Sequence, residues 1–174
     1  MIRVLLADDQ PLLAASFATL IDATPDMRAV GSARTGHEAI RLARTTRADV
    51  VLMDIRMPEL DGLAATRAIT ADEDLAGVRV LILTTFEIDE YVFAALRNGA
   101  SGFLGKSAEP AELLTAIRVV HRGDALLTPA ATRSLIARYL AHPERPATPA
   151  PERLAGLTTG GYPDAPSRLR LRNR

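Results

Sequence analysis

The feature that most constrains the fold is a series of short apolar runs, each of which stops at a polar or charged residue. In chain order, the runs cover residues 4–7, 28–33, 50–53, 78–83 and 101–105. Runs that are apolar on both faces are typical of strands in a parallel sheet that helices cover on both sides. Longer segments of helical periodicity lie between them. This alternation predicts an α/β fold with a doubly wound sheet of five parallel strands, flanked by five helices.

Local signals mark where several of these helices begin and end. Pro11 and Pro110 each stand at the start of a helical pattern, where a missing N–H costs nothing. The segment Thr35–Glu38 fits a capping box, in which the Thr hydroxyl and the Glu carboxylate satisfy free backbone N–H groups. Asn98–Gly99 and Gly123 are typical of residues that end a helix. These signals support the predicted alternation of strands and helices.

Composition divides the chain into three regions. Residues 1–125 hold all five apolar runs and carry five more acidic than basic residues, which predicts one folded domain. Residues 126–142 contain a sixth helical pattern and predict a linker helix. Residues 143–174 hold six of the 11 prolines and end in an Arg-rich stretch. That composition predicts a Pro/Ala-rich linker and a disordered basic tail.

Several classes of protein are excluded by composition. The chain has no Cys, so it has neither a disulfide framework nor a thiolate site. The uncharged stretch Pro11–Ile21 is too short to span a bilayer. Asp8 and Asp9 stop the first apolar run before it could form the core of a signal peptide. We therefore expect a soluble, cytoplasmic protein with no membrane partner.

Polar side chains at the ends of the predicted strands form the candidate site. In an open α/β sheet, a ligand binds outside the carboxyl ends of the strands. These ends carry Asp8, Asp9, Asp54, Thr84 and Lys106, and Lys106 is the only lysine beside 20 arginines. Clustered carboxylates repel one another, a repulsion that Mg²⁺ relieves, and a lysine can bind phosphate. Each residue alone is more often a cap, a turn or a surface residue, so the prediction rests on their common position.

Five segments give the chain a family resemblance. They are residues 4–11, 50–58, 61–62, 83–86 and 99–106. Their order and spacing resemble the receiver domain of response regulators in two-component systems, in particular regulators with a LuxR-type (NarL-type) helix-turn-helix output. The resemblance covers residues 1–125 and implies a flavodoxin-like fold with strand order 2-1-3-4-5. It also implies a phosphorelay signalling protein rather than an enzyme, with Mg²⁺ as its cofactor.

The resemblance implies roles for the acidic residues. Asp54 would be the phospho-acceptor for a sensor histidine kinase, since a carboxylate can act as a phosphoryl nucleophile. Asp9, Asp54 and the backbone carbonyl of Arg56 would bind Mg²⁺ directly. Asp8 would help to bind the ion through water. The metal would neutralise charge on the phosphoryl group during transfer.

Three further residues would pass the signal on. Thr84 would donate its hydroxyl to a phosphate oxygen, and Lys106 would pair with another. Phe103 would be an aromatic switch that turns inward as Thr84 moves toward the phosphate. The face formed by the fourth helix, the last strand and the last helix of the receiver would change, and phosphorylation could then produce a homodimer.

The region after the receiver departs from the family pattern. Leu154–Thr158 resembles the opening of a LuxR-type output domain, but only 16 residues follow Thr158. A helix-turn-helix domain needs several helices of ~11–12 residues each. We therefore expect a remnant of the output domain, so that DNA binding is expected for the family but not for this chain. A complete transcriptional regulator that binds DNA remains the alternative.

Two other functions share this kind of fold. A Mg²⁺-dependent phosphohydrolase would carry its nucleophile on the first strand, with a second Asp two residues later. The first strand here ends in Asp8-Asp9-Gln10, which does not fit that pattern. A flavodoxin-like cofactor binder would need a small or hydroxyl-rich phosphate loop after the first strand, where the two carboxylates would instead repel a phosphate.

Overall fold

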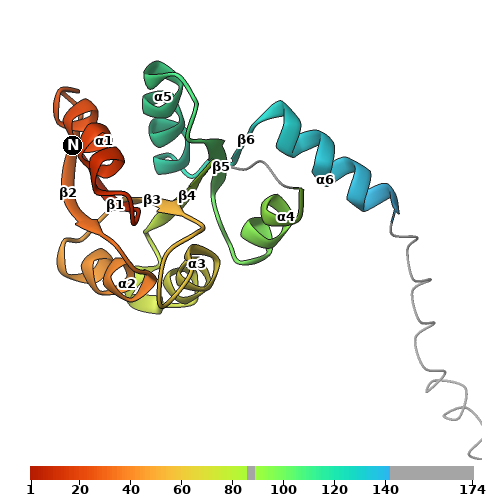
Figure 1. The fold of residues 1–174 in the computed structure, drawn as a ribbon, viewed down its shortest axis with the longest axis horizontal. Coiled ribbons are helices and arrows are strands. Elements are labelled where there is room, and N and C mark those ends of the chain that lie inside the picture. The colour runs from red at the N-terminus through yellow and green to blue at the C-terminus, as the bar shows by residue number, and fades with distance from the viewer. Residues whose placement is uncertain (86–88, 142–174) are drawn as a thin grey trace, which may run out of the picture. The chain divides into compact units, whose positions relative to one another are not determined.

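A computed structural model describes residues 1–85 and 89–141 of the chain (Figure 1). The strands are β1 (Ile2–Ala7), β2 (Met27–Ala33), β3 (Val50–Asp54), β4 (Arg79–Thr84), β5 (Gly102–Gly105) and β6 (Leu126–Leu127). The helices are α1 (Pro11–Asp22), α2 (Gly36–Thr45), α3 (Gly62–Thr70), α4 (Asp89–Arg97), α5 (Pro110–His121) and α6 (Pro129–Ala141), with a 3₁₀ turn η1 (Glu73–Leu75). The tail predicted for residues 143–174 lies outside the described residues.

The sheet is entirely parallel, with the order β2-β1-β3-β4-β5-β6. The predicted order 2-1-3-4-5 is confirmed, but the predicted count of five strands is wrong by one. The additional strand is β6, in which Leu126 pairs with Gly102 and Leu127 with Phe103. Two residues are too few to show a strand periodicity in the sequence, because the strand exists only through its pairing with β5.

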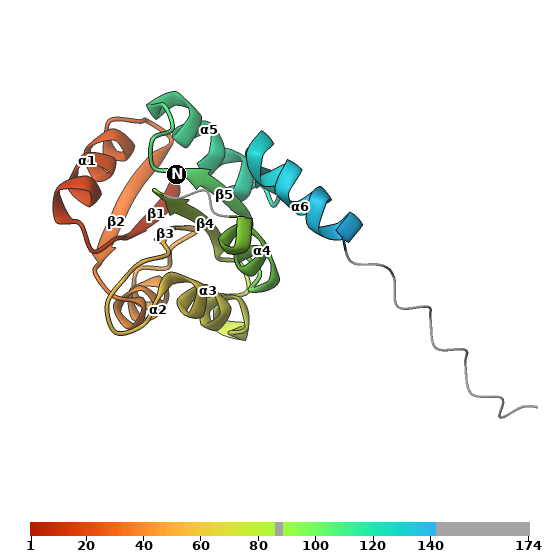
Figure 2. The same cartoon turned by 45° about the vertical axis from the view of Figure 1, so that its right-hand side comes forward.

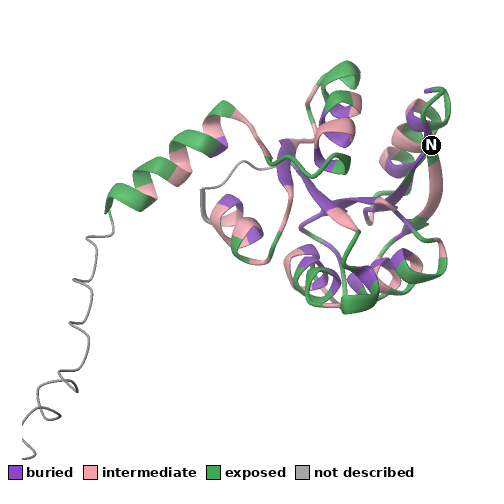
Figure 3. Cartoon of the chain, turned by 180° about the vertical axis from the view of Figure 1, so that it is seen from behind, coloured by how far each residue is buried: buried purple, intermediate pink, exposed green. Residues whose placement is uncertain are grey.

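Helices cover both faces of the sheet, as the doubly wound pattern requires (Figures 1 and 2). Side chains from alternate positions of the strands enter two separate apolar cores. One core lies under α1 and α5 and includes Leu6, Ile21 and Ile117. The other lies under α2, α3 and α4 and includes Leu5 and Ile69. The central strands are therefore buried on both sides, as Figure 3 shows in purple, and this explains their unbroken apolar runs.

The start of α2 shows a modified form of the predicted capping box. The Thr35 hydroxyl accepts a hydrogen bond from the backbone N–H of Glu38 at 3.2 Å, as predicted. The Glu38 carboxylate accepts from the N–H of Arg34 at 2.8 Å, one residue before the N-cap rather than at the N-cap itself. Both side chains still satisfy free backbone donors, and they fix the point at which the chain leaves β2.

The sixth helical pattern forms α6, which packs beside α4. Ala131 is buried in the core that α4 shares, and the Arg138 guanidinium lies 4.3 Å from the centroid of the Phe93 ring. Residues 126–141 are thus in contact with the sheet through β6 and with α4 through α6. Among the residues that the structure describes, no helix is both long and apolar enough to cross a membrane.

Candidate functional site

The strand order brings the predicted site residues to one edge of the sheet. Asp54 is the last residue of β3 and Thr84 the last of β4. Asp8 directly follows β1, and Lys106 directly follows β5. The backbone N–H of Lys106 donates to the carbonyl of Thr84 at 2.8 Å, which continues the pairing of β4 with β5 past the last residue of β5. Four adjacent parallel strands therefore place these side chains around a single point.

Lys106 lies between two of the carboxylates. Its Nζ atom is 2.6 Å from Oδ2 of Asp8 and 3.0 Å from Oδ2 of Asp54. All three side chains are less than a tenth exposed. The ammonium group is therefore ion-paired with both carboxylates, and its three N–H donors can serve these oxygens and a further ligand. The other Asp8 oxygen accepts from the backbone N–H of Gln10 at 2.9 Å.

Burial and charge act in opposite directions on these groups. Burial raises the pKa of the Asp54 carboxyl, the nearby Lys106 ammonium lowers it in part, and the Asp8 carboxylate raises it again, so that the net shift is upward. Burial would lower the pKa of Lys106, but its contacts with Asp8 and Asp54 outweigh burial and hold the pKa above its ordinary value. Lys106 is therefore charged at neutral pH.

Three carboxylates form a potential cation site. One oxygen each of Asp8, Asp9 and Asp54 lies within 4.8 Å of the others. When all three are ionised, Lys106 neutralises only one of the charges, which leaves two negative charges in a largely buried cluster. A hard divalent cation with a preference for oxygen ligands fits both the charge and the donor set. Asp9 is half-buried and lines an open pocket of about 450 Å³, so the cluster can be reached from solvent.

The loop between β3 and α3 packs against the backbone of Asp54. The N–H of Gly62 donates to the carbonyl of Ile55 at 2.9 Å, and the Asp61 carboxylate caps α3 by accepting from the N–H of Ala64. The fully buried Thr66 hydroxyl donates to the carbonyl of Gly62 at 2.7 Å. No site role is predicted for these residues from the sequence, although Asp61 and Gly62 form one of the segments of family resemblance. An Asp-Gly pair seven residues after a strand-end Asp is the signal that could have identified them.

The remaining predicted residues lie in different surroundings. Thr84 is buried at the end of β4, beside the carboxylate cluster. Arg56 lies in the loop after β3 with an exposed side chain, and it lines the same pocket as Asp9. Phe103 is completely buried in the core beneath α4 and does not reach the carboxylates' edge of the sheet. The structure thus brings together the acidic residues, Thr84 and Lys106, and places Phe103 in the core.

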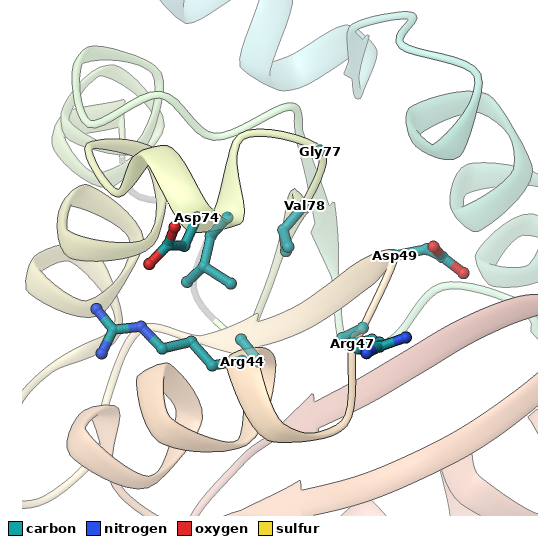
Figure 4. Close-up of a pocket in the computed structure, with 9 residues that line it drawn as sticks. Arg44, Arg47, Asp49, Asp74, Gly77 and Val78 are labelled. Atoms are coloured by element: carbon teal, nitrogen blue, oxygen red, sulfur yellow. The ribbon is translucent and has the colours of Figure 1, made fainter.

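A second pocket lies at the opposite edge of the sheet, where β3 and β4 begin (Figure 4). It has a volume of about 430 Å³, and its charged lining residues include Arg44 from α2 and Asp74 from η1. Arg44 is ion-paired with Asp72, and the Arg3 side chain binds the backbone carbonyl of Arg47 nearby. These contacts join α2, η1 and β1 to one another. They give Arg44 a structural role, and none of the predicted site residues lines the pocket.

Comparison with known proteins identifies relatives of this arrangement. The family model of the response regulator receiver domain matches residues 4–118. The chain is 42% identical over 153 residues to the uncharacterized transcriptional regulatory protein YxjL of Bacillus subtilis, a match that covers 85% of this chain and 69% of that protein. It is 35% identical over 139 residues to the oxygen regulatory protein NreC of Staphylococcus carnosus, with coverage of 79% and 63%. The chain therefore spans about two thirds of the length of these relatives.

Solved structures give the same result. A LuxR-family two-component response regulator from Aurantimonas superposes with a TM-score of 0.72 at 33% identity, covering 79% of this chain and 97% of that chain. The receiver domain of the response regulator NarL from Mycobacterium tuberculosis superposes with a TM-score of 0.67 at 31% identity, covering 70% and 97%. Both superpositions match the fold that the sequence predicted.

Proposed function

Because this chain belongs to the response regulator receiver family, with relatives of the LuxR and NarL type, we propose that Asp54 accepts a phosphoryl group from a sensor histidine kinase. The observation that carries the proposal is the position of the Asp54 carboxylate. It is buried at the end of a central strand, 3.0 Å from the single lysine and within one cluster of three carboxylates. Beside such a carboxylate, the lysine can pair with a phosphoryl group, and the neighbouring carboxylates can bind a cation.

In the proposed transfer, an ionised Asp54 oxygen attacks the phosphorus atom of a phosphohistidine. The new P–O bond forms as the P–N bond breaks, and the histidine nitrogen keeps the electron pair of that bond. Attack requires the anionic form of Asp54, which burial disfavours and Lys106 favours. Lys106 thus has one role before transfer, in which it supports the nucleophile. After transfer, its ammonium group can pair with a phosphoryl oxygen.

We propose that Asp9, Asp54 and the Arg56 carbonyl hold Mg²⁺ directly and that Asp8 helps through water. When bound, the ion would supply charge neutralisation to the transferring phosphoryl group. The two negative charges left after pairing with Lys106, and a donor set made only of oxygens, support this assignment. Asp8 is well suited to an indirect role, because its two oxygens already contact Lys106 and the Gln10 N–H.

The phosphorylated state would then act as a signal. Thr84 would bind a phosphoryl oxygen through its hydroxyl, which would pull on the end of β4. Phe103 pairs with Ile82 of β4, so a shift of that strand would change the packing of the core under α4. A homodimer on phosphorylation is the proposed consequence. A held phosphoryl group serves signalling, not turnover, and we propose that the chain is a switch rather than a phosphohydrolase.

Two of the relatives are named as transcriptional regulatory proteins, which raises the question of whether this chain binds DNA. We propose that these 174 residues do not bind DNA sequence-specifically. The support is in the sequence, since Gly160–Gly161, Pro163 and Pro166 would interrupt a helix in residues 159–174. The alternative is a chain that keeps the DNA binding of its relatives.

The acceptor is tested by incubation with Mg²⁺ and acetyl phosphate, followed by intact mass spectrometry. We expect one phosphoryl group on the wild-type chain and none on Asp54→Asn. Asp22→Asn is the matched control and should still take up one phosphoryl group, because it removes a carboxylate outside the cluster while Asn keeps the oxygen that accepts from the Ala29 N–H. Uptake by Asp54→Asn at the wild-type level would show that the acceptor is another residue.

A further inference from the structure

Three arginines gather on a surface that the phosphoryl site does not use. Arg67 from α3, Arg97 from α4 and Arg138 from α6 line a pocket of about 690 Å³, together with Phe93, Ala94 and Asn98. Among the side chains that the structure describes, none of those lining it is acidic. Arg67 and Arg97 are exposed, and within the described part of the chain neither has a carboxylate at ion-pair distance. The pocket therefore presents two exposed guanidinium groups, those of Arg67 and Arg97, to a ligand.

An apolar groove adjoins this three-arginine pocket. It has a volume of about 440 Å³ and is lined by Phe93, Leu135, Ile136, Arg138, Tyr139 and Leu140. Three of these side chains are unusually exposed for their type, Ile136 at 53%, Tyr139 at 73% and Leu140 at 75%. In Figure 3, most of α6 has the green of exposed residues. Clustered exposed apolar side chains mark interaction surfaces in proteins of this size.

Phe93 and Arg138 belong to both hollows and join them into one surface. The guanidinium of Arg138 lies 4.3 Å from the Phe93 ring centroid, and that of Arg97 lies 5.7 Å from it. The ring thus holds two of the three arginines in place at the boundary of the groove. A ligand on this surface would meet guanidinium groups on one side and aliphatic and aromatic side chains on the other.

We propose that this α3–α4–α6 surface binds a partner protein through an acidic, amphipathic peptide segment. Its carboxylates would pair with Arg67 and Arg97, since guanidinium groups match carboxylates in geometry and charge. Its apolar side chains would enter the groove along α6, as in other complexes where an amphipathic helix occupies an apolar groove. The proposal is independent of phosphoryl transfer at Asp54.

Charge distinguishes this occupant from two others. Residues 143–174 of the chain itself carry six Arg against three acidic residues, so the three arginines would repel them. A second copy docked face to face would bring two sets of these arginines together, which is also unfavourable. The groove also speaks against a nucleic acid, because phosphates would satisfy the arginines and leave the apolar side chains exposed.

The test uses fluorescence anisotropy with two labelled 15-residue peptides and the full 174-residue chain. One peptide has Leu at helical spacing with Glu between, and the other has Gln in place of every Glu. We expect the Glu peptide to bind, roughly tenfold more tightly than the Gln peptide. Its affinity should fall as salt rises, because exposed charges are screened. No binding of the Glu peptide, or equal binding of the two, would overturn the proposal.

Variants locate the binding surface. Arg67→Glu combined with Arg97→Glu should weaken binding of the Glu peptide roughly tenfold or more. Tyr139→Ser should weaken both peptides. Arg133→Glu, an exposed change on α6 outside both hollows, should leave binding unchanged, and circular dichroism should show every variant folded. An equal loss in Arg133→Glu would overturn the assignment.

Competing occupants are separated in the same samples. Duplex DNA displacing the peptide at matched charge concentration would point to a nucleic-acid surface and overturn the proposal. Self-association of the wild-type chain that Tyr139→Ser abolishes, seen by analytical ultracentrifugation, would assign the surface to a second copy and also overturn it. If the chain stays monomeric and DNA does not displace the Glu peptide, the results support an acidic peptide as the occupant.

Discussion

Gly62 packs against Asp54 so closely that a Cβ atom at position 62 would lie 1.9 Å from the Asp54 carbonyl oxygen. No side chain fits there without moving backbone, because the nearest atoms belong to the strand and not to a flexible side chain. The first residue of α3 is thereby held against the last residue of β3. The loop that carries Arg56 is closed by this contact, so the backbone of the cation site depends on a glycine eight positions after Asp54.

The first prediction follows from this contact. Gly62→Ala should lower the free energy of unfolding by about 1–3 kcal/mol, as overpacked sites do, and should slow phosphorylation by acetyl phosphate because the loop after β3 must shift. Urea unfolding and mass spectrometry measure the two effects. Gly77→Ala is the control, because a Cβ atom there meets nothing within 4 Å. If Gly62→Ala behaved like Gly77→Ala, the loop would not need this close approach.

A second prediction concerns the cation. Mg²⁺ at about 100 times its dissociation constant should stabilise the wild-type chain by about 2.7 kcal/mol, since it binds only the folded carboxylate cluster. Asp9→Asn should remove most of this gain. Without metal, it should raise the stability of the fold, because the repulsion between like charges is reduced. Asp22→Asn, remote from the cluster in sequence and fold, should keep the full response. Thermal melts with and without Mg²⁺ decide the matter, and an unchanged response in Asp9→Asn would contradict the assignment.

The common position of the site residues was predictable from the sequence, because the carboxyl ends of parallel strands lie at one edge of the sheet. Asp8, Asp54, Thr84 and Lys106 are 98 residues apart from first to last, yet each ends or directly follows a strand. The bridging position of Lys106 between two carboxylates was not predictable, because side-chain direction after β5 depends on packing. Sequence periodicity also cannot show β6, which is defined by its partner strand.

The three-arginine pocket illustrates the other limit of sequence reasoning. Arg67, Arg97 and Arg138 come from three different helices and share no motif or spacing. Only the packing of α6 beside α4, through Arg138 and Phe93, brings them together. Such a surface depends on tertiary contacts between helices. Counts of charged residues along the sequence do not reveal it.

The third prediction is a pH dependence. Arg118 on α5 holds Asp26, in the turn before β2, through two hydrogen bonds of 2.8 Å. The contact lowers the pKa of the Asp26 carboxyl, so its stabilising effect is complete above the ordinary carboxyl pKa and is lost as pH falls through the lowered value. Arg118→Gln should therefore reduce the Tm at pH 7 and converge with the wild type at strongly acidic pH.

Arg122→Gln serves as the control for this pair. Its partner Asp124 is 3.7 Å away and both side chains are about two thirds exposed, so its removal should change the Tm little at any pH. A difference between Arg118→Gln and the wild type that stayed constant from neutral to acidic pH would show that the loss is one of packing and not of charge.

The last prediction concerns DNA. A recognition helix must be presented by a packed partner helix before it can enter the major groove. Residues 159–174 hold Gly160–Gly161, Pro163 and Pro166 and lack apolar periodicity, so their sequence predicts neither helix. Their arginines can give only weak, salt-sensitive contacts with phosphates, in the range of ~10⁻⁴–10⁻⁶ M or weaker. In an anisotropy titration at physiological salt, the 174-residue chain should not distinguish a promoter from random DNA, with or without phosphorylation. Nanomolar binding with ~10³-fold preference for one sequence would contradict this and favour a chain that reads DNA as its relatives' names indicate.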